Sequence, residues 1–304
     1  MFTFLPGPFL VQFSGPFYLS TDNRYDVFKW AIGDHRFLQK KASELIWKNR
    51  IIQPSIKIEV EPQAYQFTIL GQVKYGHILK NQSKSWDHDW DFKRDRTGNI
   101  TSKLVLTTKS QATGNILDLS GAIGYSLGLF KDNLLTFYVG YDYSDYRYKN
   151  YGDKQLAYDT NFSFSSGGLS CKYNYKTQSP WLGLSVNVSI TDKFGVTPTI
   201  KYYSFKHIGK GYWIHRADLE QNPSFKNNAK GKGIGFDLDF IYKYSNNIDL
   251  TLNLATKKFK MKKEGINKMF LNSRNFGGRR VETIKLIDLS LRSSSISAGL
   301  KYKL

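Results

Sequence analysis

The stretch 116-ILDLSGAIGYSLGLF-130 alternates between two kinds of side chain with a period of two. Successive side chains of a β-strand point to opposite faces, so this stretch predicts a strand with one apolar face and one face of small or polar residues. At about fifteen residues it is much longer than the usual strand of five or six. The apolar face comprises Leu117, Leu119, Ile123, Tyr125, Leu127 and Leu129, with Gly121 in the same register.

The same alternation recurs along the chain, which indicates an all-β protein built from long strands. A soluble sandwich or barrel of this size needs an apolar interior, whereas the second face here carries Gly, Ser, Thr, Asp and Asn. An apolar outer face and a polar inner face are typical of a membrane-spanning barrel, in which ring closure removes unpaired strand edges. The tyrosine-rich runs 138-YVGYDYSDYRY-148 and 202-YYSF-205 are typical of aromatic girdles at the membrane interfaces.

Short and long connections alternate between these strands. The four short turns are expected at 61–64, 131–133, 191–193 and 245–247, and the five long polar loops at about 21–43, 80–103, 147–165, 207–230 and 259–283. The sequence therefore predicts a single domain over 1–304, a ten-stranded antiparallel up-and-down transmembrane β-barrel. In such a meander all the long loops emerge at one end.

The composition restricts the partners and the compartment. Aromatic residues make up 15% of the chain and the formal net charge is +19, which favours a polyanionic partner such as a phosphorylated glycolipid over a merely basic soluble surface. No apolar run reaches the roughly 18–20 residues of a membrane helix, and the single cysteine, Cys171, excludes an intrachain disulfide. The N-terminal residues lack a basic segment and contain Pro6, Pro8 and Pro16, so we expect the export signal to be absent from this sequence.

The segment 83-SKSWDHDWDFKRD-95 concentrates acidic residues in the second long loop, and the fourth long loop carries His215. Because both loops leave the same end of the barrel, Asp87 and Asp89 are expected to face His215 across the opening. Carboxylates two residues apart in an extended segment lie on one side of it, where like charge raises the pKa of one of them. Such a pair can hold a water for a histidine acting as general base.

Two other interpretations of this cluster stay open from the residues alone. Asp-x-Asp-x-Asp opens a calcium-binding loop, but Phe92 stands where that loop needs Gly, and Gly98 stands where it needs Glu. The segment is also compatible with a solvated charged loop in which Lys and Arg balance the aspartates.

Four segments resemble, in the same order, the omptin family of ten-stranded outer-membrane barrel proteases. They are 43-SELIWKN-49, 87-DHDWD-91, 172-KYNYKTQSPWLGL-184 and 297-SAGLKYKL-304. The resemblance implies that Asp87 and Asp89 hold the attacking water and that His215 is the catalytic base. Omptins place an aspartate two residues before this histidine, where the present chain has Trp213; Asp218 is a candidate for replacing its support.

This departure leaves two hypotheses open, and with them the assignment as an enzyme. The first is an omptin-like aspartate/histidine endopeptidase that cleaves near basic residues. The second is a non-proteolytic omptin-like barrel acting as an adhesin, a surface-binding protein or a structural protein. Omptins recognise basic side chains through acidic residues at the barrel mouth, and Asp22, Asp26 and Glu220 fall in the expected loops.

The resemblance also implies a lipid partner in the bacterial outer membrane, with the long loops facing the cell exterior. Lys258, Lys260, Arg279 and Arg280, in or beside the fifth long loop, are expected to contact lipopolysaccharide phosphates. Lipopolysaccharide would then be a structural lipid, and neither a metal nor another cofactor is expected. We expect a monomer with a peptide or protein substrate and, since no recognition motif is present, no nucleic acid.

Overall fold

The computed structural model describes residues 13–34, 40–62, 66–129, 133–158, 171–214, 219–272 and 280–303, and these form a single β-sheet. A short 3₁₀ turn, η2 (Lys80–Gln82), separates two strands, and no described segment forms an apolar helix long enough to cross a membrane. The strands are β1 (Phe13–Ser14), β2 (Phe17–Asp34), β3 (Lys40–Pro62), β4 (Phe67–Ile78), β5 (Lys84–Arg94), β6 (Ile100–Gly128), β7 (Leu134–Tyr158), β8 (Lys172–Ser189), β9 (Phe194–Tyr212), β10 (Phe225–Lys243), β11 (Ile248–Met261), β12 (Gly265–Leu271) and β13 (Arg280–Tyr302).

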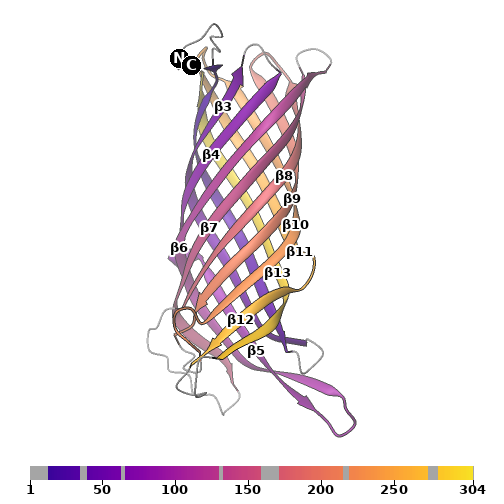
Figure 1. Cartoon of the computed structure of the whole chain (residues 1–304). Coiled ribbons are helices and arrows are strands. Elements are labelled where there is room, and N and C mark those ends of the chain that lie inside the picture. Colours follow the sequence, from indigo (N-terminus) through magenta and orange to yellow (C-terminus); the bar gives the residue numbers. More distant parts are fainter. Residues whose placement is uncertain are drawn as a thin grey trace.

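The sheet closes into a ring of ten antiparallel strands, as predicted (Figure 1). Consecutive barrel strands pair with each other, and pairing of β13 with β2 and of β3 with β4 completes the circle. β4 with β5, and β11 with β12, each serve as one interrupted barrel strand, since β5 continues the pairing of β3 with β6 and β12 continues that of β10 with β13. β1 and the C-terminal end of β13 lie at one end of the barrel, which we call the end of the chain termini, and β5 and β12 lie at the other (Figure 1).

The outer surface is apolar because every second residue of the long strands faces outwards. In 116–130 the odd-numbered residues are the outer ones, as predicted, and Ile123 is 58% exposed. The neighbouring strands present Val139 and Leu182 in the same way. These exposed side chains form a belt that matches the lipid-facing band of a transmembrane barrel.

The strands extend further than the expected loop boundaries. β2 runs to Asp34 and β3 resumes at Lys40, so most of 21–43 is strand; β5 occupies much of 80–103, and β12 lies within 259–283. A membrane-spanning strand needs only about 9–11 residues, whereas β6 has 29. The barrel therefore continues beyond the apolar belt as a paired sheet at its long-loop end.

Aromatic side chains fill the interior near this end, which differs from the expectation that aromatic residues face outwards. Tyr141 and Tyr202 are indeed outside, but the alternation turns Tyr146, Tyr148 and Tyr203 inwards. The rings pack on one another, for example Tyr146 on Tyr175 at 4.4 Å between ring centroids. We call this group the aromatic layer; it comprises Phe28, Trp47, Tyr146, Tyr148, Tyr173, Tyr175 and His207, each at most 1% exposed.

The aromatic layer separates two interior cavities along β2. Towards the end of the chain termini lies a polar cavity of about 340 Å³ lined by residues that include Asp22, Arg24 and Lys74. Here charged side chains are paired, such as Lys74 with Asp22 at 2.6 Å. Some of these ion pairs, such as Arg24 with Asp118, join strands that are not neighbours in the sheet and so tie separate parts of the barrel together.

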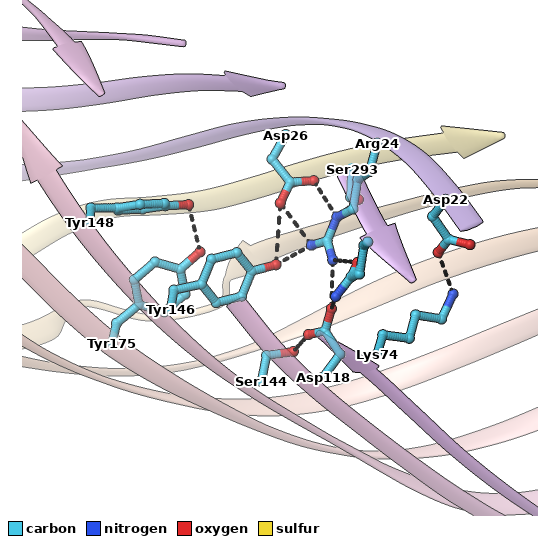
Figure 2. Close-up of polar contacts among 11 residues, drawn as sticks. Asp22, Arg24, Asp26, Lys74, Asp118, Ser144, Tyr146, Tyr148, Tyr175 and Ser293 are labelled. Carbon is cyan, nitrogen blue, oxygen red and sulfur yellow. Dashed lines mark hydrogen bonds and ion pairs between the residues drawn. The ribbon is translucent and has the colours of Figure 1, made fainter. Parts of the chain in front are cut away.

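Arg24 is the centre of the most extensive of these networks (Figure 2). Its guanidinium lies 2.7 Å from the carboxylates of both Asp26 and Asp118. It also donates hydrogen bonds to the side chains of Ser293 at 2.9 Å, Gln53 at 3.3 Å and Tyr146. A buried guanidinium needs this many acceptors to offset the loss of its hydration.

Candidate functional site

The predicted aspartate pair lies on β5, beyond the apolar belt at the long-loop end. β5 pairs on one side with β3, where Asp87 faces Leu45 and Asp89 faces Ser43, and on the other side with β6. The segments 43–49 and 87–91, which carry two parts of the omptin resemblance, are therefore neighbouring strands. Asp87 and Asp89 both face the barrel interior, as the period of two predicts.

The two carboxylates line a cavity of about 90 Å³ on the far side of the aromatic layer from the larger cavity. Its walls mix apolar and polar side chains from seven strands and the segments beside them. Besides the two aspartates, they include Trp30, Ile32, Ser43, Leu45, Ser85, Leu106, Thr108, Ser110, Asn150, Cys171, Trp213, Leu219, Phe225, Asn267 and Met269. This volume is ample for several ordered waters.

Trp213, at the position where the omptin resemblance implies an aspartate, contacts one member of the pair directly. Its indole Nε1–H donates a hydrogen bond to Oδ2 of Asp87 at 3.3 Å. The ring packs against Phe225 at 4.9 Å, and the backbone N–H of Trp213 donates to Oγ of Ser224 at 2.8 Å. The indole is thus held in place from two directions, and it points its one donor at a carboxylate.

His215 and Asp218, the predicted base and its alternative support, lie outside the described residues. Trp213 and Leu219, on either side of that range, both line the cavity. The third aspartate of the cluster, Asp91, does not join the pair: it is exposed, lies past a bulge in the strand, and accepts a hydrogen bond from the backbone N–H of Phe92.

His88 lies between the two aspartates in sequence and therefore faces the other way. Its Nδ1 is 3.0 Å from Oγ1 of Thr107, and its ring is 5.9 Å from that of Trp90. Partial burial lowers the pKa of His88 below its usual value of 6.5, and this outweighs the opposing pull of the Glu44 and Asp89 carboxylates. His88 thus favours the neutral form on the outer face of β5.

Asp22 and Asp26, considered above as acidic recognition residues in a loop, lie instead on β2 in the barrel interior. Asp22 pairs with Lys74 and Asp26 with Arg24, and both aspartates are at most 2% exposed. Neither carboxylate is accessible to a basic side chain of a substrate. Glu220 lies beyond the end of β9, where its backbone N–H donates to the carbonyl of Phe270.

Of the residues predicted to contact lipid, Lys258 and Lys260 are exposed on the outer face of β11. Arg280 begins β13 and lies 3.7 Å from Glu282. Arg279 lies outside the described residues.

The strand register shows that Lys258 and Lys260 belong to a larger group of outward-facing cations. Five pairs face each other directly across neighbouring strands: Lys206 with Lys230, Lys210 with Lys226, Lys226 with Lys268, Lys232 with Lys260, and Lys258 with Arg292. We call these residues the basic ladder. All of them are exposed, and within the described part of the chain none forms an ion pair.

Several of these features were not identified from the sequence. Trp30, Ser85 and Asn267 line the cavity, yet each lies in a segment whose inward face could be assigned only once the strand bounds were known. The ladder is a property of register, because its members are spread over 206–292 and become neighbours only when the strands pair. The runs of alternating Lys in 226–232 and 258–262 are its only local signal.

A closed ring of long antiparallel strands with an apolar belt outside and a polar interior defines a transmembrane β-barrel of the bacterial outer-membrane type. The chain belongs to the Pom family, described as Protochlamydia outer membrane protein, whose model matches residues 18–304. The outer membrane is therefore its location. No curated protein sequence matches the chain.

Among solved structures, the chain is similar to the outer membrane protease OmpT from Escherichia coli, with a TM-score of 0.71 and 16% identity over 96% of this chain and 97% of that one. This confirms the predicted omptin-like architecture. The translocator domain of the autotransporter NalP from Neisseria meningitidis matches with a TM-score of 0.40 and 9% identity over 95% and 88% of the two chains. A FadL homologue from Pseudomonas aeruginosa matches with a TM-score of 0.29 and 7% identity over 97% and 91%.

Proposed function

We propose that this outer-membrane barrel is an endopeptidase that hydrolyses peptide bonds with a water held between Asp87 and Asp89, at the end that faces the cell exterior. The observation that carries the proposal is that both carboxylates line one cavity with room for water. Two carboxylates on one face of a strand can accept hydrogen bonds from the same water and orient it towards a substrate carbonyl. The low polarity of the surrounding wall strengthens these interactions.

His215 is the base in this proposal, as the omptin resemblance implies. It follows Trp213 by two residues, and Trp213 and Leu219, which flank this part of the chain, both line the cavity. A histidine is suited to accept the proton of the attacking water near neutral pH.

Cleavage beside basic residues is the specificity that the resemblance implies. Asp22 and Asp26 do not support it, because both are neutralised inside the barrel. A substrate screen therefore has to include uncharged residues as well as Lys and Arg on both sides of the cleaved bond.

The experiment is cleavage of a fluorogenic peptide library by the barrel refolded in detergent with lipopolysaccharide. We expect Asp89→Ala to lower the rate at least about 100-fold, the lower bound for a lost general acid–base group. Asp91→Ala is the matched control, since Asp91 is exposed on the same strand and outside the cavity. Full activity of the folded Asp89→Ala variant would exclude this mechanism.

The hydrogen bond from Trp213 to Asp87 favours the second candidate, a non-proteolytic outer-membrane barrel. An indole N–H on the carboxylate occupies one of the oxygens that would otherwise accept from water, and it cannot orient a histidine as a carboxylate does. If the wild-type barrel cleaves nothing and Trp213→Asp does, the ancestral site is intact and the present chain has lost the activity.

The basic ladder supports lipopolysaccharide as the lipid partner. Like charges directly opposite each other on paired strands are destabilising, so this surface favours a ligand that carries several negative charges. The ladder begins immediately beyond the apolar belt: on the outer face of β10, Lys232 lies two residues before the exposed Ile234, on the side of the long loops. That is the level of lipid phosphate groups, which Lys and Arg bind through charge-assisted hydrogen bonds.

This partner is tested by the rise in melting temperature on adding lipopolysaccharide, compared with its dephosphorylated form. A Lys near an anionic membrane surface contributes about 1 kcal/mol, so Lys232→Gln/Lys260→Gln should weaken binding by about 2 kcal/mol, or roughly thirtyfold. Lys84→Gln/Lys93→Gln, a pair of exposed lysines on β5, is the control. An equal loss of lipopolysaccharide affinity in the two double variants would show that binding depends only on the net charge of the barrel.

A further inference from the structure

Three polar atoms of the cavity wall have no hydrogen-bond partner among the residues that the structure describes. They are Nε1 of Trp30, Oγ of Ser85 and Oδ1 of Asn267, and their side chains are at most 2% exposed. They come from β2, β5 and β12, which are distant in sequence but surround the same cavity.

Buried polar groups in folded proteins almost always have partners, because an unsatisfied donor or acceptor keeps the full cost of its lost hydration. One such atom is unremarkable in a chain of this length. Three around a single cavity indicate a guest that the wall is built to bind.

The chemistry of the three atoms restricts that guest. The indole N–H of Trp30 can only donate, the amide oxygen of Asn267 can only accept, and the hydroxyl of Ser85 can do either. The guest must therefore present an acceptor and a donor within a space of about 90 Å³.

We infer that this cavity binds an uncharged primary carboxamide, the group at the end of Gln and Asn side chains. Its oxygen accepts from Trp30, and its NH₂ group donates to Oδ1 of Asn267 and to Oγ of Ser85. The inference rests on the proposed function: the carboxamide would belong to a substrate residue next to the cleaved peptide bond. It adds a neutral subsite to the specificity for basic residues that the resemblance implies.

Charged groups fit this wall less well. An anion is repelled by Asp87 and Asp89, which line the same cavity. A cation would gain from these carboxylates but would leave the indole N–H of Trp30 without an acceptor and facing like charge. The apolar walls formed by Ile32, Leu45 and Leu106 favour a group without net charge.

The experiment follows the indole ¹⁵N–H resonances of the barrel refolded in detergent during titration with small probes. The probes are acetamide, methylammonium chloride and sodium acetate. Trp30 is the reporter, assigned with Trp30→Phe. Trp181 is the internal control, because its indole donates to Asp142 in the other cavity at 2.8 Å.

We expect acetamide to shift the Trp30 resonance with saturation, while Trp181 is unaffected and the two ions give no saturable shift. Losing one hydrogen bond should weaken acetamide binding about tenfold in Asn267→Leu. Ser85→Ala removes only one hydroxyl and provides a second variant if Asn267→Leu does not fold.

Two results would overturn the inference. If acetamide shifts the Trp30 resonance linearly, and equally in the wild type, Asn267→Leu and Ser85→Ala, the cavity holds only water. A saturable shift with methylammonium at lower concentration than with acetamide means that it is a cation pocket. Because acetamide binding requires no cleavage, saturation without peptidase activity would reject the proposed function alone, and cleavage without saturation would reject only the carboxamide subsite.

Discussion

Replacing Arg24 by methionine tests whether its guanidinium holds the buried charge network together. The side chain is 4% exposed and lies 2.7 Å from carboxylate oxygens of Asp26 and Asp118. Methionine fills similar space but leaves the two carboxylates without their shared cation. Removing one partner of a buried ion pair typically costs about 3–5 kcal/mol, so we expect the free energy of unfolding to fall by about 3–5 kcal/mol.

Two further variants separate this effect from a general loss of packing. Arg24→Met/Asp26→Asn/Asp118→Asn removes the carboxylate charges as well, and it should recover most of the loss because neutral replacements of whole buried ion networks are often tolerated. Arg50→Met is the matched control: Arg50 is exposed, lies over the Tyr25 ring at 5.7 Å, and should change stability by less than about 0.5 kcal/mol.

The assay is urea unfolding in detergent micelles, followed by tryptophan fluorescence and extrapolated linearly to zero denaturant. Unfolding and refolding curves have to coincide for the free energies to be compared. A loss below about 1 kcal/mol for Arg24→Met, or a triple variant no more stable than the single one, would refute the reasoning, since either result means that the carboxylates do not need the guanidinium.

Three other predictions follow from particular residues. Phe28→Ala opens the aromatic layer, so it should lower the free energy of unfolding by about 3–5 kcal/mol and raise ion conductance in planar bilayers. Phe137→Ala, on the outer face, should leave the conductance unchanged. Burial keeps the pKa of His88 in the folded barrel below 6.5. As the pH falls below 6.5 the unfolded chain therefore binds the proton before the folded one does, and the free energy of unfolding decreases until His88 is also protonated in the folded barrel. His88→Gln should remove this loss, seen as a smaller difference between melting temperatures at pH 5.5 and 7.5. Gly98→Ala strains the hairpin tip, where φ is +87°, and should speed amide hydrogen exchange there without changing the melting temperature of the barrel.

The ring of strands could be predicted because its outer face meets lipid. Lipid requires an uninterrupted apolar pattern, and 116–130 shows it without reference to any other part of the chain. The alternation of short and long connections then fixed the number of strands and the end at which the site lies.

The length of the strands could not be predicted in the same way. Along 21–26 most residues on both faces are polar or charged, so this part of the strand has the composition of a loop. Asp22, Arg24 and Asp26 are nevertheless buried, because their partners come from strands far away in sequence. A pattern along one strand does not reveal pairing of this kind.

The position of the aspartate pair could be predicted from the sequence, but its contact with Trp213 could not. The period of two places Asp87 and Asp89 on one face, and the meander brings them to the end that carries the fourth long loop. The bond from Trp213 to Asp87 joins residues 126 positions apart and depends on the packing of the indole against Phe225. Only the fold shows that the departure from the omptin pattern touches the aspartate pair itself.

The measurement that tests the central claim most directly is a crystal structure of the detergent-solubilised barrel at a resolution that shows ordered water. We predict a water within about 3.2 Å of the carboxylates of both Asp87 and Asp89, inside the cavity that they line. A structure in which no water reaches both carboxylates, or in which a Lys or Arg side chain fills the space between them, would contradict the claim that the pair holds a hydrolytic water.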